Sequence, residues 1–357
     1  MKSSVHSFGS WNLLTLSLAL LFALPFFSLI ITAGSGGENV WGHLLSTVMP
    51  GYLKNPFWPM LGVGSGTLLL GVSTGWLISM TEFPGRRMME WALLLPLAFP
   101  GYIIAMVYVE LLEFSGPVQE QLRLWFGWQN YMDYWFPPIA SLGGAIMMLS
   151  LVLFPYVYLL ARTAFLQQSV TLMEASRMLD KSAVNSFFMI ALPLARPAIV
   201  VGVSLAMMET LADFGTMQLF AVQTFTTGIY NTWFGAYNAP GAAQLSLSLL
   251  TFISFFIFLE RYSRKQQRFN AQSSIKNVHT RYYLSRIRAV LALLFCIFPV
   301  LFGFALPAGL LIQWATESWR GVMLDRFFSD AGNSIFLAGV TALLGVFIGL
   351  FMAFGSR

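Results

Sequence analysis

Charged side chains are scarce in this chain of 357 residues. Asp, Glu, Lys and Arg together make up 10% of it, whereas hydrophobic residues make up 57% and the mean hydropathy is +0.69. A water-soluble domain needs more charge than this to cover its surface. The composition therefore excludes an ordinary soluble protein and predicts an all-α polytopic membrane protein.

Several kinds of functional site are also missing from the sequence. The single cysteine, Cys296, has no partner within the chain for a disulfide. The three histidines, His6, His43 and His279, lie outside the apolar segments and show no metal-ligand spacing. The phosphate-binding pattern G-x-x-x-x-G-K-[ST] does not occur. We therefore expect no metal site and no cofactor bound by this chain, and we do not expect it to be an enzyme by itself.

Long apolar segments are what the sequence does contain. A membrane-spanning helix needs about 20 apolar residues, and eight segments qualify. We place them near 11–32, 57–80, 91–112, 139–160, 194–213, 242–259, 289–314 and 334–354. The first segment is too long for a signal-peptide core and lacks a small-x-small cleavage site, so we interpret it as a retained anchor.

The basic residues are distributed unevenly between the two sides of the membrane. If the N-terminus is cytoplasmic, the inside segments hold 16 Lys and Arg residues and the outside segments hold 4. Positive charge accumulates on the cytoplasmic side of membrane proteins, so this asymmetry predicts the orientation. The basic run at 261–288 is typical of a juxtamembrane linker; a lipid-binding or RNA-binding patch is the alternative, and we expect no nucleic-acid partner.

A short pattern recurs along the chain. The letters L-G-V-x-x-G occur at 70–75 in the second apolar segment and again at 344–349 in the eighth, an offset of 274 residues. Small residues four apart let helix backbones approach closely in lipid, so ordinary packing is one interpretation. The other is a duplicated membrane domain, in which spans one and two correspond to spans seven and eight.

One loop between two apolar segments carries a specific pattern. The run E-A-S-R-M-L-D at 174–180 is followed by I-A-L-P at 190–193. It resembles the EAA loop of binding-protein-dependent ABC importer permeases, whose pattern is E-A-A, three residues, G, nine residues, I, one residue, L-P. The spacing is kept from the glutamate to the proline. Ser176 replaces the second alanine, and Asp180 stands where the family has glycine; aspartate tolerates the left-handed backbone of such a turn.

This resemblance implies a type I (MetI-like) permease core gripped by a separate cytoplasmic ATPase dimer, which binds the ATP and Mg²⁺. Residues 163–190 are too polar to span a membrane and are expected to form two short helices that transmit the motion of the ATPase. An amphipathic helix on the lipid surface is the alternative. The residues implied in ATPase coupling are Glu174, Ala175, Ser176, Arg177, Asp180, Ile190, Leu192 and Pro193.

The resemblance and the repeated pattern together give a domain organisation. We expect an N-terminal anchor helix and periplasmic loop at 1–56, a permease domain at 57–260 with its coupling loop at 163–193, and a basic cytoplasmic linker at 261–288. Residues 289–357 would then be the start of a second, truncated permease half. A second half or a second copy would be a partner in the membrane, alongside lipid.

Further segments resemble ferric-iron ABC permeases of the bacterial inner membrane. They are E-T-L-A-D-F-G at 209–215, T-F-T-T-G-I-Y at 224–230, F-P-G-R-R at 83–87 and L-P…P-G-Y at 95–102. The resemblance implies import of ferric iron delivered by a periplasmic iron-binding protein. Thiamine, phosphonate, sulfate or a polyamine remains open as cargo, and an ion-coupled secondary transporter or a channel is the alternative from another class.

Three carboxylates are candidates for the translocation path. Glu209 and Asp213 lie four residues apart on one helix face, and Glu110 lies in the third apolar segment. Ionisable groups at membrane depth generally face a cavity or a partner, and carboxylate oxygens suit a hard cation such as Fe³⁺. The alternative is structural: Asp213 caps a helix end or pairs with a hydroxyl, and Glu209 bonds between helices.

The outside stretches 113–138 and 214–241 are rich in aromatic residues. Such residues usually form a belt at the membrane interface. The alternative is a docking surface for the periplasmic partner, and the candidate residues in the second stretch are Thr226, Thr227, Tyr230 and Trp233.

Overall fold

The computed structural model describes residues 10–35, 51, 54–168, 183–264, 281–319 and 324–355. The chain divides into two compact units, one of Gly36–Leu311 and the other of Met1–Ser35 with Ile312–Arg357. In the described ranges, seven helical segments are long and apolar enough to cross a membrane. A shorter apolar stretch, Ala239–Phe255, is part of the helix Ala239–Arg264. The predicted all-α polytopic architecture is confirmed.

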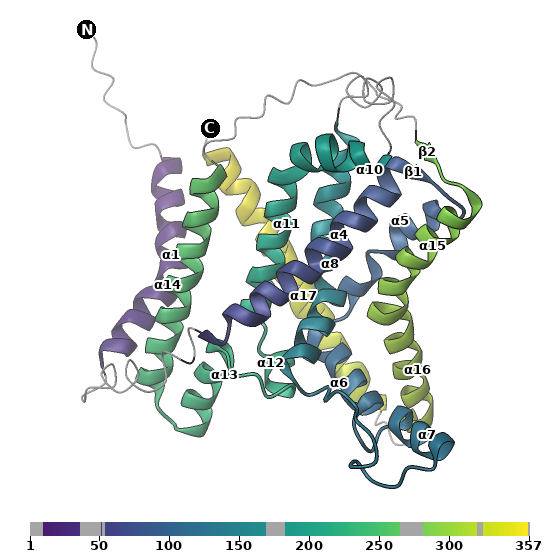
Figure 1. Ribbon diagram of the computed structural model, residues 1–357. Helices are drawn as coiled ribbons and strands as arrows, with labels where there is room; N and C mark the ends of the chain where they lie inside the picture. Colours follow the sequence, from purple (N-terminus) through teal and green to yellow (C-terminus); the bar gives the residue numbers. More distant parts are fainter. Residues whose placement is uncertain are drawn as a thin grey trace. The chain divides into compact units, whose positions relative to one another are not determined.

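Figure 1 shows the helices and strands, coloured along the chain from purple at the N-terminus to yellow at the C-terminus. The first unit to be described, Gly36–Leu311, contains α4 (Phe57–Met80), β1 (Thr81–Glu82), α5 (Arg86–Ala92), η2 (Leu95–Ala98), α6 (Gly101–Leu112), α7 (Pro117–Phe126), α8 (Leu142–Leu166), α10 (Ala183–Ser186), η3 (Phe187–Ala191), α11 (Leu192–Ala212), α12 (Gly215–Leu219), α13 (Phe225–Tyr230), η4 (Asn231–Gly235), α14 (Ala239–Arg264), β2 (Tyr282–Tyr283), α15 (Arg286–Val300) and η5 (Leu301–Ala305). Helix α16 (Leu306–Ser318) crosses the boundary between the units, and the other unit contains α1 (Ser10–Gly34) and α17 (Leu324–Gly355).

Helices α4, α8 and α11 form the centre of the larger unit. Glycines on α4 allow its backbone to touch α8. A Cβ on Gly71 would lie 2.9 Å from the Phe154 carbonyl oxygen and 2.8 Å from the Tyr158 nitrogen, and one on Gly75 would lie 3.3 Å from the Ala161 Cβ. Close packing of small residues is the usual means of helix association in lipid. The pattern at 70–75 therefore allows close packing of α4 on α8, as the packing interpretation predicted.

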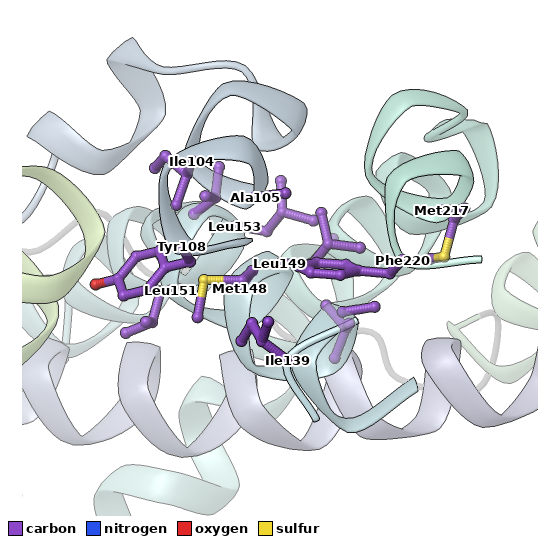
Figure 2. Close-up of a cluster of buried hydrophobic side chains, with 14 residues drawn as sticks. Ile104, Ala105, Tyr108, Ile139, Met148, Leu149, Leu151, Leu153, Met217 and Phe220 are labelled. Carbon is purple, nitrogen blue, oxygen red and sulfur yellow. The ribbon is translucent and has the colours of Figure 1, made fainter. Parts of the chain in front are cut away.

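Around this contact, buried side chains form a core that joins α6, α8 and α12. Ile104, Ala105 and Tyr108 of α6 pack against Met148, Leu149 and Leu151 of α8, with Met217 and Phe220 at the far side (Figure 2). The Tyr108 hydroxyl donates a hydrogen bond of 2.6 Å to the Phe302 carbonyl oxygen of η5. This hydrogen bond connects α6, in the predicted permease domain, to η5, which continues α15.

The third apolar segment is broken rather than continuous. A single span was expected near 91–112, but α5 ends at Ala92, the short turn η2 follows, and α6 begins at Gly101. Phe99 and Pro100 are both extended, with ψ of 132° and 141°. A proline forces the preceding residue out of the helical region and cannot donate its own hydrogen bond, so Pro100 ends the helical path. This break places Pro100 and Gly101 beside the site described below.

Two π-helical segments also lie just before a proline, but there the helix continues. Segment η3 is followed by Leu192 and Pro193, and η5 is followed by Leu306 and Pro307. Proline lacks an N–H and crowds the preceding turn, and a π-turn absorbs such a mismatch without ending the helix. The helix from Ala183 through α11 is therefore continuous, with Pro193 in the first turn of α11.

The predicted boundary at 288–289 does not coincide with a boundary between compact units. Helix α15 belongs to the larger unit, which extends to Leu311. Its residues Ala289, Ala292 and Cys296 are buried against Ile78 and Phe83. In the other unit, α17 carries the second copy of the pattern, and no atom lies within 4 Å of a Cβ built on Gly345 or Gly349.

Candidate functional site

An acidic cavity lies where α11 ends and α6 begins. It encloses about 230 Å³ and is lined by Leu97, Phe99, Pro100, Gly101, Leu149, Val152, Leu153, Tyr156, Glu209, Ala212 and Asp213. We call this the acidic cavity. It brings together two of the three carboxylates that the sequence singled out, and among the described residues that line it none is basic.

The two carboxylates have different roles in the geometry. Asp213 is the first residue after α11, with ψ of 116°. Its Oδ1 accepts a hydrogen bond of 2.7 Å from the Thr216 N–H, and its Oδ2 accepts one of 2.9 Å from the Thr216 hydroxyl. Asp213 therefore holds the turn into α12, as the structural alternative expected. Glu209 is exposed and lines the cavity.

The broken third segment fits tightly against this turn. A Cβ on Gly101 would lie 3.1 Å from Asp213 Oδ2 and 3.0 Å from Thr216 Oγ1, and a Cβ on Gly215 would lie 2.7 Å from the Tyr102 Cβ. Only glycine fits at both places without moving a neighbour. The blocks at 95–102 and 209–215, which resembled the same family separately, are thus two sides of one junction.

Glu110 does not take part in this cavity. It lies in α6, is exposed, and is absent from the residues that line the cavity. The reason is the direction of the helix: Gly101, at the first turn of α6, meets Asp213, and Glu110 lies nine residues further on, more than two helical turns away. Sequence analysis did not separate Glu110 from the other two carboxylates, because it did not take into account the break that Pro100 imposes before α6.

Of the four candidate docking residues, the two threonines hold their own segment in place and the two aromatic residues are exposed. Thr227 is 4% exposed, and its hydroxyl accepts a hydrogen bond from the Thr224 N–H in a capping box. The Thr226 hydroxyl donates to the Asp213 carbonyl oxygen at 3.0 Å. Both threonines thus hold the segment in place, and Thr227 is not available to a partner.

Tyr230 and Trp233 are exposed. They line an open apolar groove of about 520 Å³ with Phe214, Thr226, Ile229 and Phe234. The Tyr230 ring lies 4.6 Å from the Phe214 ring and 4.9 Å from the Phe234 ring, measured between centroids. An aromatic surface of this kind suits either the membrane interface or a protein partner, as expected from the sequence.

The other aromatic-rich stretch, 113–138, contains α7 and is held together by side-chain contacts. The Tyr134 hydroxyl donates to Gln119 Oε1 at 2.6 Å, and Arg123 lies over the Phe114 ring. Asp133 Oδ2 accepts hydrogen bonds from two backbone N–H groups, and these lower the pKa of Asp133 from its ordinary value, that of Asn130 first and that of Gln129 second. These contacts give this stretch a fixed shape.

At the opposite end of the core, the structure describes only the base of the loop at 163–193. Glu174, Ala175, Ser176, Arg177 and Asp180 lie outside the described residues. The two ends of the loop are joined by a buried hydrogen bond of 2.8 Å from Gln168 Nε2 to the Ala191 carbonyl oxygen. Ile190 and Leu192 pack beside Ala191 against one cluster of buried residues in α4 and α8.

An aromatic contact fixes this base to α4. The Trp76 ring lies 5.5 Å from the Phe165 ring and 5.1 Å from the Phe187 ring, measured between centroids. Phe165 lies near the start of the loop at 163–193 and Phe187 lies near its end. Trp76, near the C-terminal end of α4, thus contacts aromatic rings from both ends of the loop.

Comparison with known proteins gives consistent matches. The family described as "Binding-protein-dependent transport system inner membrane component" matches residues 67–269. The chain is 28% identical over 347 residues to the Fe(3+)-transport system permease protein FbpB 2 of Haemophilus influenzae; the match covers 95% of this chain and 63% of that protein's length. It is 29% identical over 210 residues to the molybdenum transport system permease protein ModB of Escherichia coli K12, covering 56% of this chain and 88% of that protein.

The fold also resembles that of a solved transporter. A chain of a bacterial alginate ABC transporter, crystallised in complex with a pentasaccharide-bound periplasmic protein, superposes with a TM-score of 0.55 at 14% identity, covering 74% of this chain and 96% of that one. At this identity the likeness concerns the fold alone.

Proposed function

Because the chain belongs to the family of binding-protein-dependent transport system inner membrane components, we propose that it is the pore-forming subunit of an ATP-driven importer. In this proposal a cytoplasmic ATPase dimer binds and hydrolyses ATP, and a periplasmic binding protein delivers the cargo. The ATPase holds the loop at 163–193, and its closure on ATP opens the acidic cavity to the outside. The chain itself carries out no chemistry.

The base of the loop supports this role. Gln168 and Ala191 are hydrogen-bonded, and Phe165 and Phe187 flank Trp76. A loop that is tied at both ends to a packed helix passes its motion on rather than dissipating it. The test is co-purification of a cytoplasmic ABC ATPase subunit with this chain from native membranes. Glu174→Arg is expected to abolish it, and association that survives this variant would count against coupling through the loop.

We further propose that the cargo is ferric iron. The observation that carries this is the chemistry of the acidic cavity, which presents Glu209, Asp213 and Tyr156 and no basic side chain among its described lining residues. Carboxylate and phenol oxygens suit a hard cation, whereas an oxyanion would be repelled by both carboxylates. The 28% identity to an Fe(3+)-transport permease over most of the chain agrees with this.

An oxyanion cargo is the second candidate, because a relative at 29% identity is a molybdenum permease. Uptake of radiolabelled iron and of radiolabelled molybdate, in cells with and without the gene, separates the two. We expect the gene to raise uptake of iron and not of molybdate. The reverse result would overturn the ferric proposal and leave the importer proposal intact.

A variant of the cavity links the cargo to the site. Glu209→Gln removes a charge that lines the cavity and keeps the side-chain size, so iron uptake is expected to fall severalfold. Glu110→Gln is the matched control, because Glu110 is exposed and lies outside the cavity. Equal loss in both variants, or none in Glu209→Gln, would contradict the assignment.

A further inference from the structure

The short segment before α15 is bound to the turn after α4. Strand β2 pairs in parallel with β1, with Thr81 opposite Tyr282 and Glu82 opposite Tyr283. Arg281 Nη1 lies 3.3 Å from Glu82 Oε2, although the two residues are 199 positions apart. Two strands of two residues are not stable alone, so side-chain contacts must hold this junction. We call residues 281–283 the strap.

Glu82 ties the strap to a partly buried charge cluster. Arg86, whose side chain is 8% exposed, lies 3.4 Å from Glu82 and 3.7 Å from Glu90. It also donates a 3.0 Å hydrogen bond to the Ile78 carbonyl oxygen. Glu90 is paired with Arg162 of α8. Charges that are both paired and hydrogen-bonded at low exposure are held in one arrangement, so the strap is fastened to α4, α5 and α8 together.

Tyr282 ties the strap to the base of the coupling loop. It packs against the buried cluster that contains Trp76, Phe165 and Ala191. This is the cluster that receives both ends of the loop at 163–193. A movement of the loop base therefore reaches the strap directly as well as α4.

From the strap, the contacts continue to the acidic cavity. Helix α15 buries Ala289, Ala292 and Cys296 in the core and runs on into η5. There the Phe304 ring lies 5.3 Å from the Phe99 ring, and a Cβ on Gly303 would lie 3.1 Å from Pro96 Cγ. Phe99 lines the acidic cavity. The path from loop base to cavity through α15 is contiguous and lies within one compact unit.

We propose that Arg281 and Tyr282 are positioning residues for α15. Through them, α15 transmits movement of the loop at 163–193 to the acidic cavity, as a second route in addition to α4. The inference rests on the proposed importer function. In this arrangement the strap keeps its pairing with β1 and its ion pair with Glu82 throughout the transport cycle. Helices α4, α5 and α15 therefore move as one body. Transport per ATP, rather than ATP hydrolysis itself, depends on the strap.

The test measures cargo import and ATP hydrolysis by the complete transporter in proteoliposomes. Arg281→Glu places a like charge opposite Glu82, so import per ATP is expected to fall roughly threefold to tenfold. The amount of assembled complex should stay unchanged. Arg281→Lys keeps the ion pair and should restore the ratio. Arg286→Gln is the matched control, because Arg286 is exposed and has no ion pair among the described residues.

A reversible cross-link tests the pairing of the strap independently of charge. Glu82→Cys with Tyr283→Cys, in a Cys296→Ala background, removes the ion pair and places two thiols at paired positions. A short bis-methanethiosulfonate reagent should join them in native membranes. Import per ATP is expected to be low before joining, to recover after it and to fall again on reduction. Failure to join, or loss of import on joining, would overturn the inference.

The outcomes separate the two levels of proposal. If the unmodified transporter imports cargo and Arg281→Glu leaves import per ATP unchanged, the second route is overturned and the importer function stands. If Arg281→Glu lowers the amount of complex in proportion to import, the strap is only structural and the inference is also overturned. If the unmodified transporter imports nothing, both proposals fall.

Discussion

At the scale of the residue, two carboxylates four positions apart serve different purposes. Both oxygens of Asp213 are used by Thr216, which leaves Asp213 as part of the turn between α11 and α12. Glu209 lines the same cavity one turn earlier and is exposed. The spacing correctly placed them together, but only the hydrogen bonds show that Asp213 is used by a turn.

Removal of the Asp213 side chain is therefore expected to lower stability. Asp213→Ala leaves the Thr216 N–H and hydroxyl without their acceptor, at a cost of about 1–3 kcal/mol in the free energy of unfolding. Thermal unfolding of the purified protein in detergent measures the effect. Glu209→Gln is the comparison, since no capping hydrogen bond is lost, and it should leave the unfolding temperature nearly unchanged. An unfolding temperature lowered equally by both changes would contradict this division of roles.

At the scale of the element, the repeated pattern gives a matched pair of glycines. Gly71 in α4 touches the backbone of α8, whereas Gly345 in α17 has no atom within 4 Å of the Cβ position. Gly71→Leu forces the two helices apart, and overpacking of this kind costs about 1–3 kcal/mol. Gly345→Leu should cost much less. The readout is the unfolding temperature of each variant in detergent, and an equal decrease in both would show that the difference in packing is not real.

How far the sequence predicts an element depends on how local its causes are. The span at 57–80 was located to the residue because an apolar run lies between Pro56 and a polar turn. The span expected at 91–112 was misplaced, since its apolar residues continue through a break that Pro100 imposes on the backbone. Pro100 was visible in the sequence, and its effect on Phe99 was the signal that could have been used.

Contacts between distant residues were beyond prediction for a different reason. Arg281 and Glu82 each look like an ordinary charge at the end of a span, and nothing in either neighbourhood points to the other. The same holds for Tyr108 of α6 and the Phe302 carbonyl oxygen of η5. The packing of α15 into the core is of the same kind, because it depends on contacts with Ile78 and Phe83, which lie far earlier in the chain.

At the scale of the whole molecule, the proposed function depends on the orientation of the chain in the membrane. The 16 and 4 basic residues on the two sides predict that the N-terminus and the strap are cytoplasmic. The proposed function needs the same orientation, because the loop at 163–193 must face the ATPase. Met88 and Tyr131 are good reporters, since each is 66% exposed and they belong to opposite predicted sides.

Cysteine labelling in spheroplasts tests this orientation directly. In a Cys296→Ala background, Tyr131→Cys is expected to react with an impermeant maleimide added from outside, since it lies in the aromatic outside loop. Met88→Cys lies beside Arg86 and Arg87 on the predicted cytoplasmic side, and it should react only after the membrane is made permeable. Native Cys296 is fully buried, so its replacement removes background labelling without changing an exposed surface. The opposite labelling order would place the loop at 163–193 outside, where no ATP-driven partner could reach it, and the importer proposal would fail with the topology.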